Sequence, residues 1–321
     1  KQLTKGNNMN NLKKIGLTAL GTAMVSTSVN AAELSVSGAT SIFFGGRDNA
    51  DTGNGWSMTD SLTFTASGEM DNGFTVSTSL ELDGSSASYD DRSITIDMGD
   101  MGSLTFSGHG SSGPIGAWDD KTPSANEESW GTSVAASDVL DGPTNEAGMD
   151  NSFIYDYTVS DALALKAALQ PSNTTSEIES STEFGAHYTG IDGLDIYVAM
   201  GENNATSNQA DLTVFGATYA MGAITVGYQQ NESDYGDANS DEDFTAMGIS
   251  YAVSDDLSVS YGMSTLDYES STKEDQDSSA VSFSYTSGGL TVSASHQQTD
   301  NVAGTSTSDN TGYEVNFSFA F

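Results

Sequence analysis

The chain ends in GYEVNFSFAF (residues 312–321), in which every second residue is apolar: Tyr313, Val315, Phe317, Phe319 and Phe321. Alternation with a period of two predicts a β-strand that has one apolar face. In water, an uncovered aromatic ladder at the end of a chain is an aggregation hazard. Acyl chains would remove this hazard, so the tail favours a strand that faces lipid.

The composition also favours strands. The chain of 321 residues has no Cys, 4 Pro and 34 Gly, and it is rich in Ser, Thr, Asn and Asp. This profile disfavours helices and suits many short strands joined by polar turns. The absence of Cys excludes disulfides and thiolate metal sites.

The first 31 residues read as a segment that is removed. After Met9 come the basic residues Lys13 and Lys14, an apolar run over 15–29 rich in small residues, and small side chains that end at Ala31. This order is typical of a signal peptide. We expect residues 1–31 to be upstream residues plus the signal peptide, residues 1–8 to be an artefact of the reading frame, and 32–321 to be the mature barrel. A short transmembrane anchor is the alternative, although the run is short for a bilayer.

The charge balance restricts the partners. Residues 1–31 hold four of the nine basic residues, so the mature chain keeps five against all 45 acidic residues, a net charge of −40. Nucleic acid is excluded as a partner, because phosphate binding requires a basic surface. No later segment approaches 18 consecutive apolar residues, so any crossing of a membrane would use strands.

A repeat of about 32 residues organises the chain. Alternating strands follow five tyrosines at steps of 31, 31, 32 and 34 residues: Tyr157, Tyr188, Tyr219, Tyr251 and Tyr285. Each unit fits two strands, one tight turn and one longer polar loop. The tyrosines occupy the turn end of their strands, which predicts an interfacial aromatic girdle. Tyrosines packed in ordinary hairpins are the alternative.

Counting strands by this period predicts sixteen. The expected spans are 33–44, 59–68, 73–83, 92–98, 103–109, 151–159, 163–170, 182–190, 194–203, 210–220, 223–231, 243–253, 257–268, 278–286, 290–299 and 311–321. An even number lets the first and last strands pair, which removes both free edges. The predicted fold is all-β, a 16-stranded antiparallel transmembrane β-barrel.

The polar face of the strands predicts a water-filled lumen. In residues 257–264, Leu257, Val259, Tyr261 and Met263 alternate with small residues, mostly serine. By the same parity, we expect these charged residues on the pore wall: Glu81, Asp83, Asp156, Lys166, Glu183, Asp195 and Glu314.

The chain resembles a Gram-negative bacterial general porin, most closely of the alphaproteobacterial (Rhodobacter-like) type. The resemblance rests on AELSVSG at 32–38, the YxxSDxLxVS hairpins, DNSFIYDYTVSDALALKAAL at 150–169 and the terminal Phe321. It implies a homotrimer through which small hydrophilic solutes diffuse passively across the outer membrane. It also implies that Phe321 is the signal read by the barrel-assembly machinery.

In such porins the third external loop folds into the lumen and narrows it, and the matching segment is 110–150. Its acids would form the constriction: Asp119, Asp120, Glu127, Glu128, Asp138, Asp141, Glu146 and Asp150. The family commonly opposes this loop with a basic cluster. Here the inward strand cation is Lys166, whereas Arg92 has outward parity and Arg47 is expected in a loop, so we do not expect that cluster.

Fixed carboxylates in a lumen with low-dielectric walls concentrate cations, so we expect an ion channel with a cation preference. Calcium at Asp119 and Asp120 is a further expectation, since carboxylate oxygens suit that ion. The chain has no catalytic motif, and we expect no enzyme and no other cofactor. Two alternatives stay open: an outer-membrane channel specific for one solute, and a secreted acidic β-repeat adhesin.

Overall fold

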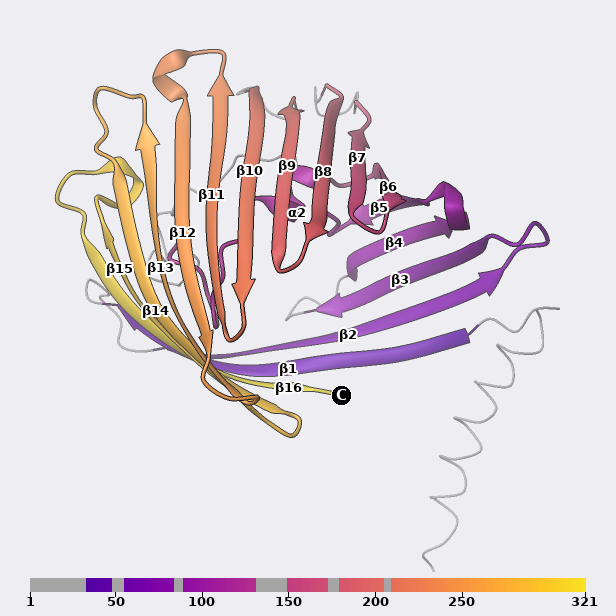
Figure 1. Ribbon diagram of the computed structural model, residues 1–321, viewed down its shortest axis with the longest axis horizontal. Coiled ribbons are helices and arrows are strands. Elements are labelled where there is room, and N and C mark those ends of the chain that lie inside the picture. The colour runs from indigo at the N-terminus through magenta and orange to yellow at the C-terminus, as the bar shows by residue number, and fades with distance from the viewer. Residues whose placement is uncertain (1–32, 48–54, 84–88, 131–148, 173–178, 205–208) are drawn as a thin grey trace, which may run out of the picture.

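The computed structural model describes residues 33–47, 55–83, 89–130, 149–172, 179–204 and 209–321. Sixteen antiparallel strands in these residues form one closed barrel in which each strand pairs with its sequence neighbours and β1 pairs with β16 (Figure 1). The predicted fold is confirmed. The closed barrel also rules out the β-solenoid form of the adhesin alternative. No helix in the described part of the chain is both long and apolar enough to cross a membrane.

The strands agree closely with the predicted spans. They are β1 (Glu33–Arg47), β2 (Gly55–Glu69), β3 (Thr75–Asp83), β4 (Tyr89–Asp97), β5 (Ser103–His109), β6 (Ser152–Ser160), β7 (Leu163–Gln170), β8 (Ser181–Ile191), β9 (Leu194–Asn203), β10 (Ala210–Met221), β11 (Ile224–Tyr235), β12 (Glu242–Ala252), β13 (Leu257–Tyr268), β14 (Gln276–Ser287), β15 (Leu290–Asp300) and β16 (Asn310–Ala320).

Connections alternate between short turns at one end of the barrel and longer loops at the other. The turn between β8 and β9 is only residues 192–193, whereas residues 110–151 connect β5 to β6 and contain the short helix α2 (Pro114–Trp118). Gly193 has a φ of +75°, a backbone conformation that favours glycine. We call the two ends of the barrel the short-turn end and the long-loop end.

The barrel closes through the tail that ends the sequence. β1 and β16 pair from Ala39↔Ala320 to Arg47↔Gly312. The ladder continues to the terminal residue, because the Phe321 N–H donates to the Gly38 carbonyl at 2.9 Å and the Gly38 N–H donates to the Phe321 carbonyl at 2.8 Å. The aromatic ladder of the tail lies on the outer face, where Tyr313 contacts Phe44.

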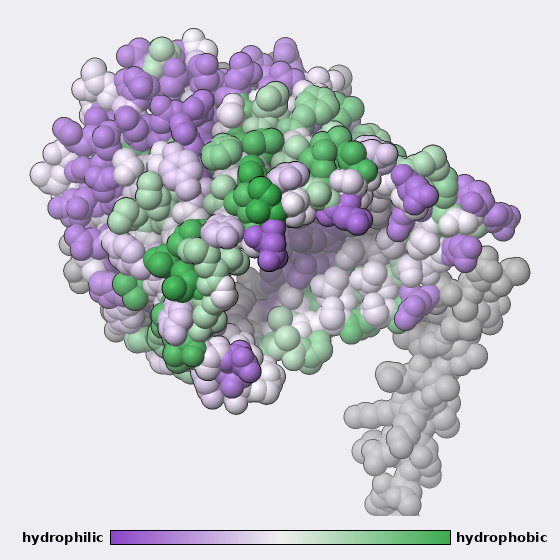
Figure 2. Space-filling view, viewed as in Figure 1, coloured by the Kyte–Doolittle hydropathy of each residue, from purple (hydrophilic) through white to green (hydrophobic). Residues whose placement is uncertain are grey.

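The outer face is apolar along the middle of the strands. Exposed outward side chains include Val198 and Met200 on β9 and Val281 and Phe283 on β14. Hydrophobic residues gather over this surface, whereas hydrophilic residues cover the long-loop ends of β11–β13 (Figure 2). The molecule is hollowed between β8–β10 and β2–β3 (Figures 1 and 2). Lipid is the solvent that suits such a band.

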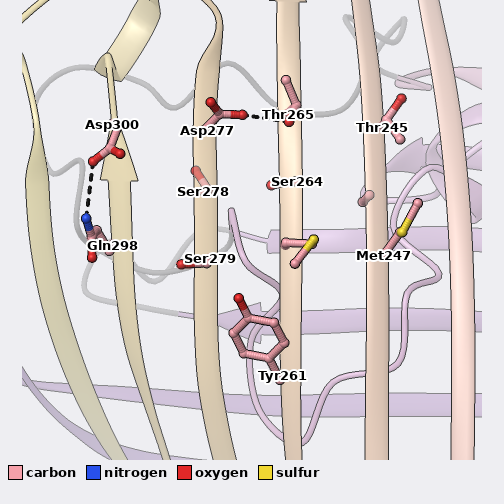
Figure 3. A pocket seen from close by; sticks show the side chains of 12 residues that line it. Thr245, Met247, Tyr261, Ser264, Thr265, Asp277, Ser278, Ser279, Gln298 and Asp300 are labelled. Atoms are coloured by element: carbon pink, nitrogen blue, oxygen red, sulfur yellow. Dashed lines mark hydrogen bonds between the residues drawn. The ribbon is translucent and has the colours of Figure 1, made fainter.

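A groove of about 350 Å³ on the outer face of β12–β15 shows where this apolar band ends. Met247, Tyr261 and Met263 line its apolar part. Nearer the long-loop end, the Thr265 hydroxyl donates to Asp277 at 2.7 Å and Gln298 donates to Asp300 at 3.3 Å (Figure 3). Over four residues, from Met263 to Asp267 on β13 and from Val281 to Asp277 on β14, the outer face therefore changes from apolar to acidic.

Candidate pore constriction

The described part of the long loop between β5 and β6 lies against the inner wall of the barrel. Helix α2 packs on β8, β9 and β10. Farther along, Asn126 hydrogen-bonds Glu314 on β16. A segment of about twenty residues therefore follows the wall from β8 to β16.

An apolar patch anchors the helix. Ile115, which is fully buried, clusters with Leu212 and Val214 on the inner face of β10, and Trp118 packs against the same cluster. The sequence reading expected small polar residues along the inner face, and here that expectation is wrong. The patch is apolar because the loop covers it and no water reaches it.

Glu183 on β8 holds the start of the helix. Its side chain is fully buried, and its Oε2 accepts a hydrogen bond from the Ile115 N–H at 3.0 Å. A Cβ at Gly113 would overlap this carboxylate, so glycine is needed where the chain passes over it. The sequence reading placed Glu183 on the open pore wall, but it lies beneath the loop.

Two carboxamides on β11 hold the next turn of the loop. Gln229 Oε1 accepts from the Lys121 N–H at 2.7 Å, and the side-chain amides of Gln229 and Asn231 both donate to the Asp119 carbonyl. Both carboxamide side chains are fully buried. They replace the water that these backbone groups would otherwise bind.

A row of glycines receives the following residues. Gly227, Gly248 and Gly262 pair across β11, β12 and β13. Pro123 lies over the first two, and a Cβ at Gly227 would overlap its ring. Beyond the row, the Ala125 N–H donates to Ser260 at 2.8 Å and Ser129 donates to Ser264 at 2.8 Å.

The far end of the described segment reaches β16. The Asn126 side-chain amide donates to Ser295 at 2.8 Å and to Glu314 Oε1 at 2.9 Å. Glu314 is 4% exposed, so it too lies under the loop and not on open wall. Trp130 packs edge-on against Phe244, with ring centroids 4.9 Å apart.

Two glutamates of the loop have raised pKa values. Burial raises the pKa of Glu127 to about 7, and the negative charges of Glu314 and Glu128 add to the effect. Burial also raises the pKa of Glu128, although hydrogen bonds, one of them from Ser124, oppose the shift. Both carboxyls therefore titrate closer to neutral pH than an ordinary glutamate.

The wall formed by β1–β3 carries open carboxylates. Glu81 and Asp83 line a hollow of about 170 Å³ together with small hydroxyl residues such as Ser41, Thr59 and Ser61. Arg47 is the last residue of β1. It lies two residues after Gly45, which pairs with the inward-facing Glu314, so the Arg47 side chain also faces inward. The sequence reading placed Arg47 in a loop; β1 continues farther than its apolar alternation and includes it.

The inward lysines lie beside aspartates. Lys166 Nζ is 3.2 Å from Asp156 Oδ1, directly across the β6–β7 pair. Lys121 Nζ is 3.0 Å from Asp120 Oδ1 on the loop. Each pair leaves little net charge at its position. The Arg92 side chain lies on the outer face of the barrel, as its parity predicted. It covers Gly108, where a Cβ would overlap it.

An aromatic cluster lies beside the helix. His187 Nε2 is 2.9 Å from Asp195 Oδ1, and the imidazole stacks on Tyr197 with centroids 4.5 Å apart. The ring centroids of Trp118 and Tyr197 are 6.2 Å apart. Sequence reasoning missed the loop-binding residues Gln229, Asn231 and Pro123 as well as this cluster. The glycines at matching positions of neighbouring strands were the signal that would have found the glycine row.

The remaining predicted residues are placed as follows. Asp150 lies just before β6, where the loop ends, and its carboxylate is 3.9 Å from the His109 imidazole at the start of the loop. Asp138, Asp141 and Glu146 lie outside the described residues. All five repeat tyrosines lie at the short-turn end of their strands, and four of them are clearly exposed: Tyr188, Tyr219, Tyr251 and Tyr285. Tyr157 stacks on Tyr155.

Comparison with protein-family models identifies the family of this chain. A family model described as Gram-negative porin matches residues 16–286. A search of curated proteins finds no match.

Several solved structures share the fold. A loop-deletion mutant of OmpT, an outer membrane protein of Vibrio cholerae, has a TM-score of 0.70 and 14% identity, covering 90% of this chain and 99% of that chain. A mutant of Rh. blastica porin has a TM-score of 0.67 and 14% identity, covering 90% and 100%. Salmonella typhi OmpF in complex with daunomycin has a TM-score of 0.68 and 12% identity, covering 90% and 97%.

Proposed function

The chain belongs to the Gram-negative porin family, and on this premise we propose that it forms a water-filled, acidic pore that passes small hydrophilic solutes and prefers cations. Its location is the bacterial outer membrane. Members of this family are channels, and we propose no enzymatic activity. We assign the chain to the alphaproteobacterial general porins on the sequence motifs of residues 32–38 and 150–169.

The observation that carries the cation preference is the sign of the charges around the constriction. The loop that follows the inner wall carries Glu127 and Glu128, and Glu81 and Asp83 line a hollow on the wall of β1–β3. The lysines Lys121 and Lys166 each lie beside an aspartate. A lumen whose walls have a low dielectric constant strengthens the field of the remaining carboxylates and concentrates cations.

The test is the reversal potential of the refolded chain in a planar bilayer under a KCl gradient. We expect a potential that favours potassium over chloride. We also expect the preference to weaken in salt of about 0.5 M or more, where the Debye length falls to a few Å. A potential that favours chloride contradicts the proposal.

The alternative of a solute-specific channel is supported by one feature, the aromatic cluster of Trp118, His187 and Tyr197 beside the loop. Stacked rings are a common means of binding sugars and other planar or ring-shaped solutes. A channel of this type shows saturation of solute flux and solute-dependent block of the ion current. A general pore shows flux proportional to concentration.

We also propose a homotrimer. Asp60 on β2 shares its outward register with the exposed residues Met58 and Leu62, so its carboxylate lies within an apolar outer face. A carboxylate that faces hydrocarbon destabilises a barrel. A neighbouring subunit removes that destabilisation by covering the strand. Light scattering of the protein in detergent measures the assembly, and a monomer contradicts this proposal.

Three further proposals rest on the sequence. Phe321 is the signal read by the barrel-assembly machinery, residues 1–31 are removed on export, and Asp119 with Asp120 binds calcium. Asp120 already contacts Lys121, which would have to move. A barrel whose thermal unfolding does not change with a calcium chelator contradicts the calcium site.

A further inference from the structure

Four side chains meet at the long-loop end of β4, β5 and β6. His109, the last residue of β5, lies between Asp90 and Asp91 of β4 and Asp150, which comes just before β6. The four side chains are about half exposed, at 45–52%. This His–Asp cluster lies at the two ends of the constriction loop, away from the loop–wall contacts described above.

The distances do not describe hydrogen bonds. His109 Nδ1 is 3.9 Å from Asp90 Oδ1 and 3.7 Å from Asp91 Oδ1. Hydrogen bonds between nitrogen and oxygen are about 2.7–3.2 Å long. One nitrogen thus faces two carboxylates that remain beyond hydrogen-bond reach, and the donor atoms of the three residues all lie within 4.8 Å of one another.

That spacing suits three ligands around one metal ion. Zinc binds histidine nitrogen at about 2.0–2.1 Å and carboxylate oxygen at about 2.0–2.2 Å, so two ligands at the tetrahedral angle lie roughly 3.4 Å apart. The two distances from His109 Nδ1, 3.9 and 3.7 Å, exceed this value by only a few tenths of an ångström, and the two carboxylate oxygens lie within 4.8 Å of each other and must also approach. Half-exposed aspartates at a strand end have the rotamer freedom for this approach.

The second ring nitrogen also has a partner. His109 Nε2 is 3.9 Å from Asp150 Oδ2. Histidines that bind metals generally donate their other N–H to a carboxylate, a carbonyl or water, which fixes the tautomer and the ring orientation. With the metal at Nδ1, Asp150 is the nearest carboxylate to the Nε2–H group, and it accepts this proton once the two atoms approach by roughly 0.7 Å.

The local backbone places these groups. A β-bulge at Arg92/Ser93 sets His109 opposite Arg92, where it would otherwise lie one residue away. Gly110 has a φ of +77°, and a Cβ at this position would overlap the Asp91 carboxylate. The chain thus turns directly over Asp91 as it enters the constriction loop.

We propose that Asp90, Asp91 and His109 bind a divalent transition-metal cation, with zinc the best fit, and that Asp150 is a positioning residue for the imidazole. An imidazole ligand favours zinc and its neighbours over calcium and magnesium, which prefer oxygen alone. Carboxylates elsewhere on the protein surface offer oxygen ligands alone, so they do not favour zinc over calcium. The bound ion joins the start of the constriction loop to its end, since His109 and Asp150 flank residues 110–149.

The test is calorimetric titration of zinc chloride into the folded full-length chain in detergent, with millimolar calcium present to fill the non-specific carboxylate sites. We expect one equivalent of zinc per chain to bind in spite of the calcium. The substitutions His109→Gln and Asp91→Asn each remove this binding. Asp150→Asn weakens it by about 10- to 100-fold, the usual effect of losing a residue that orients a ligand.

The matched control is His187→Gln. His187 also contacts an aspartate, but at the hydrogen-bond distance of 2.9 Å, and Asp195 is the one carboxylate that pairs with it among the described residues. Zinc binding that persists in His109→Gln, or that His187→Gln removes equally, overturns the proposal. So does zinc binding that calcium abolishes. Because two ligands on different strands are tested, failure of one variant to fold leaves the other decisive.

The readout does not depend on ion conduction. A chain that binds zinc as described but favours chloride contradicts the pore proposal alone. A chain that favours potassium but binds no zinc contradicts this site alone.

Discussion

The two halves of the inner wall differ in composition. From β8 to β16 the wall presents glycines, carboxamides, serines and small apolar patches, and many of these groups contact the constriction loop. On β1–β3 the wall presents Ser, Thr and open carboxylates such as Glu81 and Asp83. We call these the loop-bearing wall and the open wall.

The difference shows that one part of the barrel wall holds the loop while another part lines the water-filled pore. The loop excludes water from the wall that it covers, so the buried polar groups there need protein partners, which the loop supplies to Gln229 and Ser264 among others. The open wall needs water and charge, so its carboxylates stay partly exposed. Glu183 and Glu81 illustrate the contrast, because the first is fully buried and bonded to the Ile115 N–H while the second lines a hollow. Position relative to the loop, not residue type, decides what an inward glutamate does.

Trp118→Ala should give the largest change in channel current and stability, because it acts on the loop-bearing wall. The substitution removes the partly buried ring that packs on the Ile115 cluster of the loop-bearing wall, and the loss should cost at most about 3 kcal/mol, the lower value for a fully buried tryptophan. We expect a noisier current of altered conductance because the loop loses its anchor. Single-channel recording and denaturant unfolding in lipid vesicles measure the two effects.

The control is Phe283→Ala, because Phe283 is 40% exposed on the outer face of β14, away from the loop and from β2. Its removal should leave the current unchanged. Equal changes in current for the two variants would mean that the helix does not hold the loop in place.

Gly227→Val comes next in size. The new side chain collides with Pro123, and overpacking of this kind costs about 1–3 kcal/mol. We expect the loop to move off the glycine row and single-channel conductance to change. Gly55→Val is the matched change at the start of β2, where a Cβ meets nothing within 4 Å. A Gly227→Val channel that conducts like the Gly55→Val channel would show that the row does not seat the loop.

The fold was predictable because period-two alternation and a 32-residue repeat are local signals. Sixteen strands were expected and sixteen are present among the described residues. The main difference lies at the long-loop ends, where β1 continues to Arg47 and β11 to Tyr235, beyond the expected 44 and 231. There the strands leave the lipid band, so hydrogen bonding continues after the apolar alternation has ended.

The candidate site was predictable only in part. The loop and its acids could be found because an insertion breaks the repeat. The partners of the loop could not, because Gln229 and Lys121 are 108 residues apart and Asn126 and Glu314 are 188 apart. Parity placed Glu183 and Glu314 on the inner face, but parity carries no information about which inner positions a loop covers.

Charge removal on the two walls should separate their electrostatic roles. The double variant Glu81→Gln/Asp83→Asn neutralises open-wall carboxylates, and we expect the potassium-to-chloride permeability ratio to fall while the barrel stays folded. Glu183→Gln neutralises a carboxylate beneath the loop, and we expect little change in that ratio. Reversal potentials in a KCl gradient measure both. A larger fall for Glu183→Gln would assign the field to the buried glutamate.

The smallest expected effect is a dependence on pH that arises where the loop meets the loop-bearing wall. The pKa of Glu127 is raised to about 7, so this carboxyl is largely protonated at pH 6 and largely ionised at pH 8. The potassium preference should therefore fall as the pH is lowered from 8 to 6. Because the folded-state pKa lies above the ordinary value of 4.5, the proton stabilises the folded barrel fully below about pH 4.5, and this contribution is lost as the pH rises through about 7.

Glu127→Gln should remove the change in preference between pH 8 and 6 and leave the preference near its pH 6 value. The open-wall carboxylates have no comparable burial, so the Glu81→Gln/Asp83→Asn variant should keep the pH step while lowering the preference at every pH. If the step disappeared in the open-wall variant and persisted in Glu127→Gln, the titrating group would lie on the open wall. In that case, the buried loop contacts would be electrostatically silent across this range, and the division of the lumen into two walls would apply to packing alone.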